Sequence, residues 1–449
     1  MAKKGRIATF VIVLVVAFVV GFFGGAVGYT YIDFVSNPDH IPDSIVLEGK
    51  NTSGTFYDPN ADEYNAATRS LADDISPSAP APSTPSEGNQ SSLGNVTVDE
   101  AGISIHFIEL GNKYTGDCTY IKVGEVDILI DCGSKSTSVP YVKNYLNHYI
   151  TGALDYVIVT HAHEDHYAGF ATSKFEDSIF AYFECKNIIT FSQTNQKDTS
   201  TKYKNFKRNV AQEESDGAKV YTAQDCIDLM PSGAPNASYN NNIYGYAFNL
   251  SNAVTMTILN SVYYKERKAT TENDYSVCTL FTYNEGEHSH NYLFTGDLEK
   301  EGEDWLANPD NKVNIPQCDL YKAGHHGSKT SSNDNLMRVV KPKVICVCCC
   351  AGSSEYTKTI NNQFPTQEFI NRVAQYTADI FVTSLCVDYK NNEFESFNGN
   401  IIYIAKDDEY NMMFSNNSIR FKDSEWFNRE ITENGTTRRM RTWPQNGKT

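Results

Sequence analysis

Short apolar runs alternate with amphipathic segments from residue 103 onward, and this alternation predicts a mixed α/β domain. Apolar runs bounded by turn residues predict strands at 103–110, 118–123, 126–131, 156–160, 254–259, 277–283, 292–295 and 344–349. Apolar positions that recur at helical spacing predict helices over 138–149 and 366–376. Strands interspersed with helices in this way are typical of a layered α/β domain of about 300 residues.

A different pattern occupies the N-terminus, where residues 7–32 contain no charged side chain. Because roughly 20 apolar residues let a helix cross a bilayer, this run predicts a membrane anchor. Lys3, Lys4 and Arg6 precede the run, so the positive-inside rule places residues 1–6 in the cytoplasm. A cleaved signal peptide is the alternative, but its apolar region normally spans only about 7–15 residues. We therefore expect a single-pass protein of the cell membrane whose folded domain is extracytoplasmic.

The segment after the anchor is polar, and from residue 73 to 95 it is rich in proline and serine. Such a composition leaves little to bury, so residues 33–98 are expected to form a stalk and an extended linker. The folded domain is then expected over 99–410. Residues 411–449 are expected to form a solvated C-terminal tail, with contact between its arginines (Arg438, Arg439 and Arg441) and an anionic partner as the alternative.

Charge and cysteine usage narrow the class of protein. The formal net charge of −17 argues against a surface coated with a basic nucleic-acid footprint, although a local cationic cleft or a bound metal still suits a phosphodiester. Eleven cysteines occur without a pair of CxxC motifs, which disfavours a zinc ribbon and a small disulfide scaffold. Four of them lie within the apolar run 345–350, where cysteine behaves as a small buried hydrophobic residue.

The candidate chemistry follows directly after the apolar run 156–160. Residues 161–166 read HAHEDH, so His161, His163, Asp165 and His166 fall within six positions at the mouth of a predicted strand. A tight turn can direct the first two side chains at one ion and the last two at a neighbouring position. Imidazole and carboxylate suit zinc, manganese or iron, and the absence of cysteine disfavours a purely structural zinc site. The pattern therefore predicts a metal centre.

The HxHxDH pattern resembles the signature of the metallo-β-lactamase superfamily, and further segments strengthen the resemblance. Residues 115–121 (TGDCTYI) and 128–133 (ILIDCG) look like the opening strands of that family. Residues 292–297 (YLFTGD) resemble the strand that ends in a metal-bridging aspartate. The HHGS element within 319–331 is similar to the branch that contains the hydrolase domain of ComEC-type competence proteins and the phosphorylcholine esterases. The resemblance extends over residues 103–405.

This resemblance implies an αββα sandwich with two divalent metal ions at the strand ends. It implies that His161 and His163 bind the first ion, that Asp165 and His166 bind the second, and that Asp297 bridges both. Zinc is the expected metal, with manganese as the alternative.

The HHGS element leaves two assignments open. We favour His326 as the ligand that completes the first site and His325 as the residue that faces the substrate, with the reverse as the alternative. The branch usually carries a further histidine before proline that serves the second metal, and Phe364 stands at that position here. The second site is therefore expected to be weaker, to use water or Cys350, or to be empty.

Two metal ions in such a site lower the pKa of a shared hydroxide, which attacks phosphorus or a carbonyl carbon. Asp165 and His325 are the candidate catalytic residues, His325 as a donor to the leaving oxygen. Hydroxyl and cationic groups suit phosphate, and a carboxylate suits a cationic substrate group such as choline. The candidate substrate-binding residues are Ser328, Lys329, Thr330 and Glu299.

We therefore expect an extracytoplasmic phosphodiesterase, either nuclease-like or phosphorylcholine-esterase-like. One spanning segment does not form a channel, so the chain is not expected to pass DNA across the membrane itself. A lactonase or β-lactamase is an alternative on the same fold, because a fold does not determine its substrate. A non-catalytic scaffold with a degenerate metal site is the alternative from another class, and Phe364 is the feature that favours it.

Overall fold

The computed structural model describes residues 96–228, 237–240, 245–433 and 436–449. The expected anchor at 7–32 and the expected linker up to residue 95 lie outside the described residues. Within the described ranges, every helix is too short or too polar to cross a membrane.

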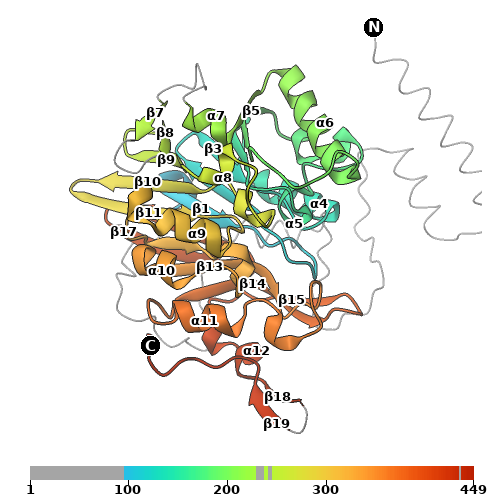
Figure 1. The fold of residues 1–449 in the computed structure, drawn as a ribbon, viewed down its shortest axis with the longest axis vertical. Helices are drawn as coiled ribbons and strands as arrows, with labels where there is room; N and C mark the ends of the chain where they lie inside the picture. Colours follow the sequence, from blue (N-terminus) through green and yellow to red (C-terminus); the bar gives the residue numbers. More distant parts are fainter. Residues whose placement is uncertain (1–95, 229–236, 241–244, 434–435) are drawn as a thin grey trace, which may run out of the picture. The chain divides into compact units, whose positions relative to one another are not determined.

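Two large sheets form the centre of the described domain (Figure 1). The strands of the first sheet, in spatial order, are β17 (Glu409–Phe414), β16 (Ile401–Lys406), β1 (Ile103–Phe107), β2 (Thr119–Val123), β3 (Val126–Ile130), β4 (Leu154–Val159), β5 (Cys185–Thr190) and β6 (Lys219–Thr222). Those of the second are β15 (Glu393–Ser396), β14 (Ile380–Asp388), β13 (Val344–Ala351), β12 (Leu320–Lys322), β11 (His288–Phe294), β10 (Thr279–Glu285), β9 (Val254–Leu259), β8 (Gly245–Asn249) and β7 (Ala237–Asn240). A separate hairpin joins β18 (Glu430–Glu433) to β19 (Thr436–Arg439).

Helices are interspersed between these strands, as the alternating pattern predicts. They are α4 (Val139–Leu146), α5 (Glu164–Tyr167), α6 (Thr201–Asp216), α7 (Ala223–Ile227), α8 (Val262–Lys265), α9 (Lys300–Ala307), α10 (Asp334–Val340), α11 (Gln367–Val373) and α12 (Glu425–Asn428). Each strand and helix expected from the sequence has its counterpart, with ends that differ by a few residues. Strands such as β5, β14 and β16 were not among those expected.

Strand β1 shows how the layers pack. Its side chains alternate between two faces, and all five of its residues are buried. Phe107 stacks on Phe294 of the second sheet, with ring centroids 6.3 Å apart. His106 points the other way, where its Nδ1 lies 2.7 Å from the hydroxyl of Tyr145 on α4. The first sheet is therefore covered by the second sheet on one face and by a helix on the other.

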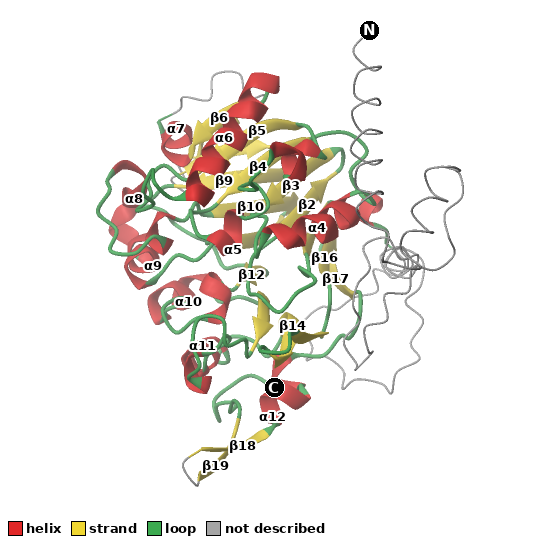
Figure 2. Ribbon diagram, turned by 90° about the vertical axis from the view of Figure 1, so that its right-hand side faces the viewer, coloured by secondary structure: helices red, strands yellow, loops and turns green. Residues whose placement is uncertain are grey.

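The second sheet is covered on its outer face by α9, α10 and α11, which lie along one side of the domain (Figure 2). Leu306, Met337 and Phe369 of these helices are buried in one cluster with Tyr321 and Ile345 of the sheet. Burying such a side chain contributes about 1.5–3 kcal/mol, so this layer is a substantial second core. The domain is thus a mixed α/β fold with two large sheets and helices on their outer faces.

Parallel strands lie at one end of the first sheet and in the middle of the second. β3, β4, β5 and β6 pair in parallel in the first sheet, and β11, β12, β13 and β14 do so in the second. The carboxyl ends of parallel strands meet at one edge of a sheet, which is where α/β proteins commonly place their sites. The residues that follow β3, β4, β11 and β12 therefore come together.

The expected domain end at residue 410 and the expected solvated tail are both corrected by the structure. β17 crosses residue 410 and pairs with β16 over six residues. Beyond it, Phe421, Trp426 and Phe427 are buried in the core beside α11, and Arg441 is only 1% exposed. These aromatic side chains have apolar surface to bury, so the segment packs against the domain instead of extending into solvent.

Candidate metal centre

The HAHEDH segment forms a tight turn at the end of β4. α5 begins directly after His163, and its single turn brings Asp165 and His166 back towards the strand end. The backbone N–H of Asp117 donates to the carbonyl of Asp165 at 2.9 Å, so a second loop lies against this turn. The loop after β3 also lies against the turn, and Gly133 permits this contact because a Cβ at this position would lie 1.8 Å from the carbonyl oxygen of Asp165.

The turn brings the first two histidines side by side, as the spacing predicts. His161 Nε2 lies 3.1 Å from His163 Nδ1, and the His161 side chain is fully buried. Burial is the largest cause that holds the pKa of His161 well below its usual value, and the neighbouring His166 and His163 add to this effect. His161 is therefore a neutral imidazole, the form that binds metal ions.

A second group of ligand atoms converges beside this pair. One atom each from Asp165, His166, Asp297 and His326 lies within 4.8 Å of all the others, and we call these four residues the four-ligand cluster. Asp297 Oδ2 is 3.0 Å from His166 Nε2 and 3.3 Å from His326 Nε2. His326 Nε2 is also 3.4 Å from Asp165 Oδ2. These side chains follow β4 in the first sheet and β11 and β12 in the second.

Several atoms of the four-ligand cluster are buried without a hydrogen-bond partner. They are the Nε2 atoms of His166 and His326 and both carboxylate oxygens of Asp297. Buried polar atoms are nearly always paired, because an unpaired one costs about 1–3 kcal/mol. A divalent cation among them would be bound by all of these atoms at once. The donor set therefore fits a metal ion such as zinc.

The other ring nitrogens of the two histidines are held by neighbours. His166 Nδ1 lies 2.8 Å from Asp131 Oδ2, and Asp131 in turn accepts hydrogen bonds from the backbone and hydroxyl of Thr160 at 2.8 and 2.7 Å. His326 Nδ1 lies 2.9 Å from the carbonyl oxygen of Cys348. With Nδ1–H as the donor in both rings, each Nε2 lone pair faces the cluster, which is the usual preparation of a metal-binding histidine.

The charge balance of the centre also requires cations. The carboxylates of Asp117, Asp131, Asp165 and Asp297 are all at least nine-tenths buried, and Lys322 is the buried ammonium group beside them. Lys322 Nζ forms an ion pair with the Asp117 carboxylate and lies 3.8 Å from Asp297 Oδ1. One ammonium group offsets only part of this negative charge, and uncompensated buried charge is costly. Divalent ions would offset the remainder.

Protons compensate part of this charge at the same atoms. Burial alone would lower the pKa of His166, but the carboxylates of Asp297, Asp131 and Asp117 raise it to about 10. Burial alone would raise the pKa of Asp297, but His166 and His326 hold it well below its usual value. A metal ion at this cluster therefore competes with protons for the histidine nitrogens.

His326 lies among the residues expected at the second and bridging positions, and its expected role of completing the first site with His161 and His163 stays a prediction. The carbonyl of Cys348 and the carboxylate of Asp117, 3.2 Å from Nδ1, turn the His326 ring towards Asp165 and Asp297. Within the described ranges, neither His161 nor His163 belongs to a group of three or more convergent ligand atoms. The contact between His161 and His163 is therefore the part of the expected first site that the structure describes.

Phe364 has a different consequence from the one expected. The four-ligand cluster is complete without a histidine at that position, because His326 supplies the imidazole. The Phe364 ring instead packs against the rings of His325 and His326, at centroid distances of 5.4 and 6.0 Å. It forms an aromatic wall of the centre.

His325 lies at the open side of the centre. Its side chain is 20% exposed, and its Nε2 is 3.9 Å from Asp297 Oδ2. Its Nδ1 lies 3.0 Å from the hydroxyl of Thr330 and 3.3 Å from Glu299 Oε1. Thr330 also donates to Glu299 at 3.1 Å. Two of the expected substrate-binding residues therefore hold His325 in place.

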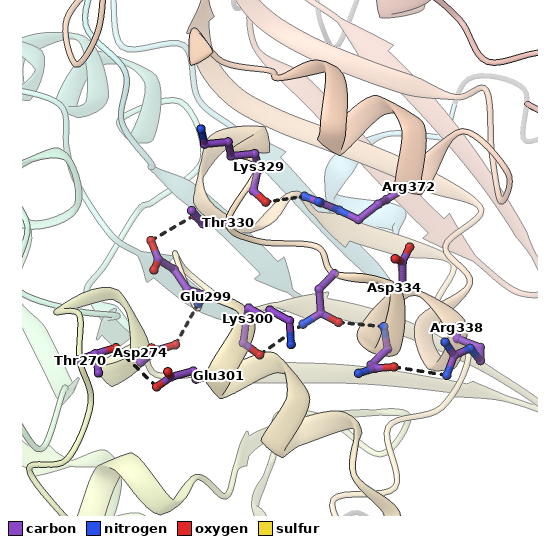
Figure 3. Close-up of a pocket in the computed structure, with 12 residues that line it drawn as sticks. Thr270, Asp274, Glu299, Lys300, Glu301, Lys329, Thr330, Asp334, Arg338 and Arg372 are labelled. Atoms are coloured by element: carbon purple, nitrogen blue, oxygen red, sulfur yellow. Dashed lines mark hydrogen bonds between the residues drawn. The ribbon is translucent and has the colours of Figure 1, made fainter. Parts of the chain in front are cut away.

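The remaining expected substrate-binding residues differ in their exposure. Ser328 is buried, and its hydroxyl accepts a hydrogen bond from the backbone of Thr330 within the same loop. Lys329 lines a cavity of about 630 Å³ together with Glu299 and Thr330, and cationic groups such as Lys300 and Arg338 lie further along it (Figure 3). Ser328 therefore does not line the cavity, whereas the other three do.

Sequence reasoning missed four residues that surround the cluster, namely Asp117, Asp131, Lys322 and Tyr356. Asp131 carried a signal, since it directly follows an apolar run that pairs in parallel with β4. Lys322 carried one too, as a charged residue inside an otherwise apolar strand. Tyr356 lies on a loop without a pattern, and nothing in the sequence marks it.

Comparison with known proteins adds to this geometry. Residues 111–179, which include the HAHEDH segment, match the family model described as the metallo-beta-lactamase superfamily. A segment of 52 residues is 40% identical to ComE operon protein 3 of Bacillus subtilis (strain 168), and this match covers 12% of the present chain and 6% of that protein.

Two of the solved structures that are similar to this chain are the following. The metallo-beta-lactamase fold protein YhfI from Bacillus subtilis is 12% identical, with a TM-score of 0.33, over 62% of this chain and 95% of that one. BJP-1, a subclass B3 metallo-beta-lactamase of Bradyrhizobium japonicum, is 14% identical, with a TM-score of 0.27, over 48% and 75%. Likeness at this level says nothing about the reaction. The family likeness of this chain therefore rests on residues 111–179, which contain the HAHEDH segment and match the metallo-beta-lactamase superfamily.

Proposed function

We propose that this protein is a metal-dependent phosphodiesterase, anchored in the membrane through residues 7–32. The observation that carries the proposal is the four-ligand cluster, whose buried Nε2 and carboxylate atoms converge on one another and lack a regular hydrogen-bond partner. Zinc is the proposed metal, with manganese as the alternative. Bound divalent ions supply an activated water and neutralise the charge that develops on the attacked group.

The chain's own residues suit a substrate that carries a phosphate. His325 lies at the open side of the cluster, where its Nδ1–H faces Glu299 Oε1 and Thr330. A ring that donates from Nδ1 donates from Nε2 as well only as an imidazolium, and this is the form in which His325 would give a proton to a leaving oxygen. Lys329 adds a cationic group on the same loop. With Lys329 included, the cationic groups that line the cavity equal the acidic ones in number, the other cations being Lys300, Arg338 and Arg372 and the acids Asp274, Glu299, Glu301 and Asp334. Lysine and arginine are the usual partners of phosphate oxygens.

The alternative of a non-catalytic scaffold has less support than the sequence suggested. Phe364 favoured it, because the substitution of an expected ligand suggested a degenerate site. The cluster has its four convergent ligand atoms regardless of that substitution. The orphaned buried atoms would be costly to retain in a protein that bound no metal.

A panel assay on the full-length protein in detergent, with zinc or manganese, tests the proposal. The substrates are bis-p-nitrophenyl phosphate, p-nitrophenyl phosphorylcholine, single-stranded DNA and a β-lactam. We expect hydrolysis of at least one phosphodiester and a loss of at least about 100-fold in Asp297→Asn, which removes a charged ligand of the cluster. Asp310→Asn, at an exposed position, is the matched control. Hydrolysis of the β-lactam alone would refute the phosphodiester assignment.

The proposed location needs a separate test. Protease added to intact cells should digest the domain that follows residue 95 and leave cytoplasmic proteins untouched. Complete protection of the domain in intact cells, with digestion after lysis, would rule out an extracytoplasmic domain.

A further inference from the structure

The loop between β13 and α11 brings a tyrosine to the metal centre. The hydroxyl of Tyr356 donates to Asp165 Oδ2 at 2.5 Å. The same carboxylate oxygen lies 3.4 Å from His326 Nε2, so the phenol is adjacent to the four-ligand cluster. Nothing in the HAHEDH or HHGS segments pointed to this residue.

Tyr356 combines an exposed ring with a hydroxyl group on a buried acid. The residue is 54% exposed, whereas Asp165 is only 9% exposed. Its ring lies 5.8 Å from that of Phe364, which packs on His325. An exposed tyrosine normally orients its hydroxyl to water, so the contact with Asp165 is a specific arrangement. The Tyr356 ring thus separates the cluster from solvent on the side of Asp165.

The segment that carries Tyr356 is held at the residue before it. Glu355 accepts a hydrogen bond from the backbone N–H of Thr115 at 3.0 Å, and its other carboxylate oxygen lies 3.3 Å from Lys135 Nζ. Thr115 belongs to the loop that carries Asp117. Position 356 is therefore tied to the same loop that lies against the HAHEDH turn.

The far side of the loop is held by the C-terminal segment. The buried guanidinium group of Arg441 donates to the carbonyl oxygens of Pro365, Gln363 and Ile360 at 2.7, 2.6 and 3.2 Å. Both ends of the loop are thus anchored, which makes the Tyr356–Asp165 contact a built feature of the fold.

We propose that Tyr356 is a positioning residue of the metal centre that acts through Asp165. Its hydroxyl fixes the direction of the Asp165 carboxylate, so that the acid meets the ion already oriented. Hydrogen-bond partners of metal ligands commonly change metal affinity 10–100-fold. The inference rests on the proposed metal-dependent function and adds to it a specific residue that neither motif contains.

Tyr356→Phe tests the role, because it deletes one oxygen and keeps the ring. Metal affinity of the full-length protein is measured by competition with a chromophoric chelator, using zinc and then manganese. We expect the dissociation constant of one bound ion to rise about 10–100-fold. Tyr182→Phe is the matched control, since Tyr182 is 43% exposed and its ring lies over Lys143. Circular dichroism of both variants should match that of the parent.

Kinetics separate positioning from substrate contact. If Tyr356 acts through Asp165, raising the metal concentration should restore the kcat of Tyr356→Phe towards the parent value. Unchanged metal affinity in Tyr356→Phe, or an equal loss in Tyr182→Phe, would refute the inference. Normal affinity with a lasting loss of kcat would also refute it, because the residue would then contact substrate. A parent protein that binds no metal would refute the proposed function itself.

Discussion

A contact of Nδ1 with a neighbouring oxygen orients each of three histidines at the centre, namely His166, His325 and His326. His166 offers Nε2 to the cluster because Asp131 holds its Nδ1, and His326 does so because of the carbonyl of Cys348. His325 differs, since Glu299 and Thr330 hold it at the open side. At the residue scale, the chemistry of each histidine therefore depends on one neighbouring oxygen that lies far away in the sequence.

A buried acid outside the centre gives a pH-dependent prediction. Glu109 is 5% exposed, it accepts a hydrogen bond from Ser396 at 2.7 Å, and its Oε1 has no hydrogen-bond partner. Burial raises the pKa of Glu109 to about 7, which the bond from Ser396 only partly opposes. The folded state then holds this proton more tightly than the unfolded state, so the contribution of Glu109 to stability falls as pH rises from about 4.5 to 7.

Glu109→Gln should remove that dependence. We expect the stability of the variant relative to the parent to increase by about 2–3 kcal/mol between pH 5 and pH 8, measured by urea denaturation. Glu176→Gln, at an exposed position, serves as the control. A difference between Glu109→Gln and parent that is the same at both pH values would contradict a raised pKa at Glu109.

At the scale of elements, the C-terminal segment that contains Trp426, Phe427 and Arg441 packs against the loop 352–366 and holds it. Trp426 and Phe427 are buried beside α11, and the Arg441 guanidinium lies 5.2 Å from the Trp426 ring. Gln367 at the start of α11 donates to the carbonyl of Thr442 at 2.7 Å. These contacts explain why the segment that composition marked as a tail belongs to the folded domain.

Arg441→Lys should weaken the hydrogen bonds that hold the loop 352–366. Lysine keeps the positive charge, but it lacks the planar guanidinium group that donates to several carbonyl oxygens at once. We expect a loss of about 2–4 kcal/mol in the free energy of unfolding. Urea denaturation with intrinsic tryptophan fluorescence reports it. Arg439→Lys, on the exposed side of β19, is the control and should change stability little. Equal stability of the two variants would show that the Arg441 contacts do not hold the loop.

At the scale of the whole domain, the four-ligand cluster joins the two sheets. Asp165 and His166 follow β4 of the first sheet, whereas Asp297 and His326 follow β11 and β12 of the second. An ion bound by all four would therefore link the two layers of the sandwich. Without it, only protons on the histidines and Lys322 offset the acidic side chains at that boundary.

Metal binding should consequently stabilise the whole domain. Zinc at about 100–1,000 times its dissociation constant should add roughly 3–4 kcal/mol, and a chelator should reverse the gain. Thermal denaturation with and without zinc measures it, and Asp297→Asn should respond far less.

Because the carboxylates raise the pKa of His166 to about 10, metal must displace a proton at neutral pH. The zinc-dependent gain should therefore increase from pH 6 to pH 8, and a gain that decreases would contradict this competition.

The sequence by itself predicted several of the central strands and helices and the ligand groups of the centre. Apolar runs predicted strands such as 254–259, which matches β9, and HAHEDH placed ligand groups within a single turn. These features are local, because strand periodicity and a six-residue turn depend on neighbouring positions along the chain. The pairing of the two sheets followed from the family resemblance.

The tertiary structure alone decided which groups meet. The carbonyl of Cys348 is 22 residues away from His326 in the sequence, and its contact with Nδ1 determines which ligand residues the His326 ring faces. Tyr356 reaches Asp165 across 191 residues, and Arg441 reaches Pro365 across 76. Such contacts depend on how strands from distant parts of the chain are brought together, and no local pattern encodes the direction of a side chain at that distance.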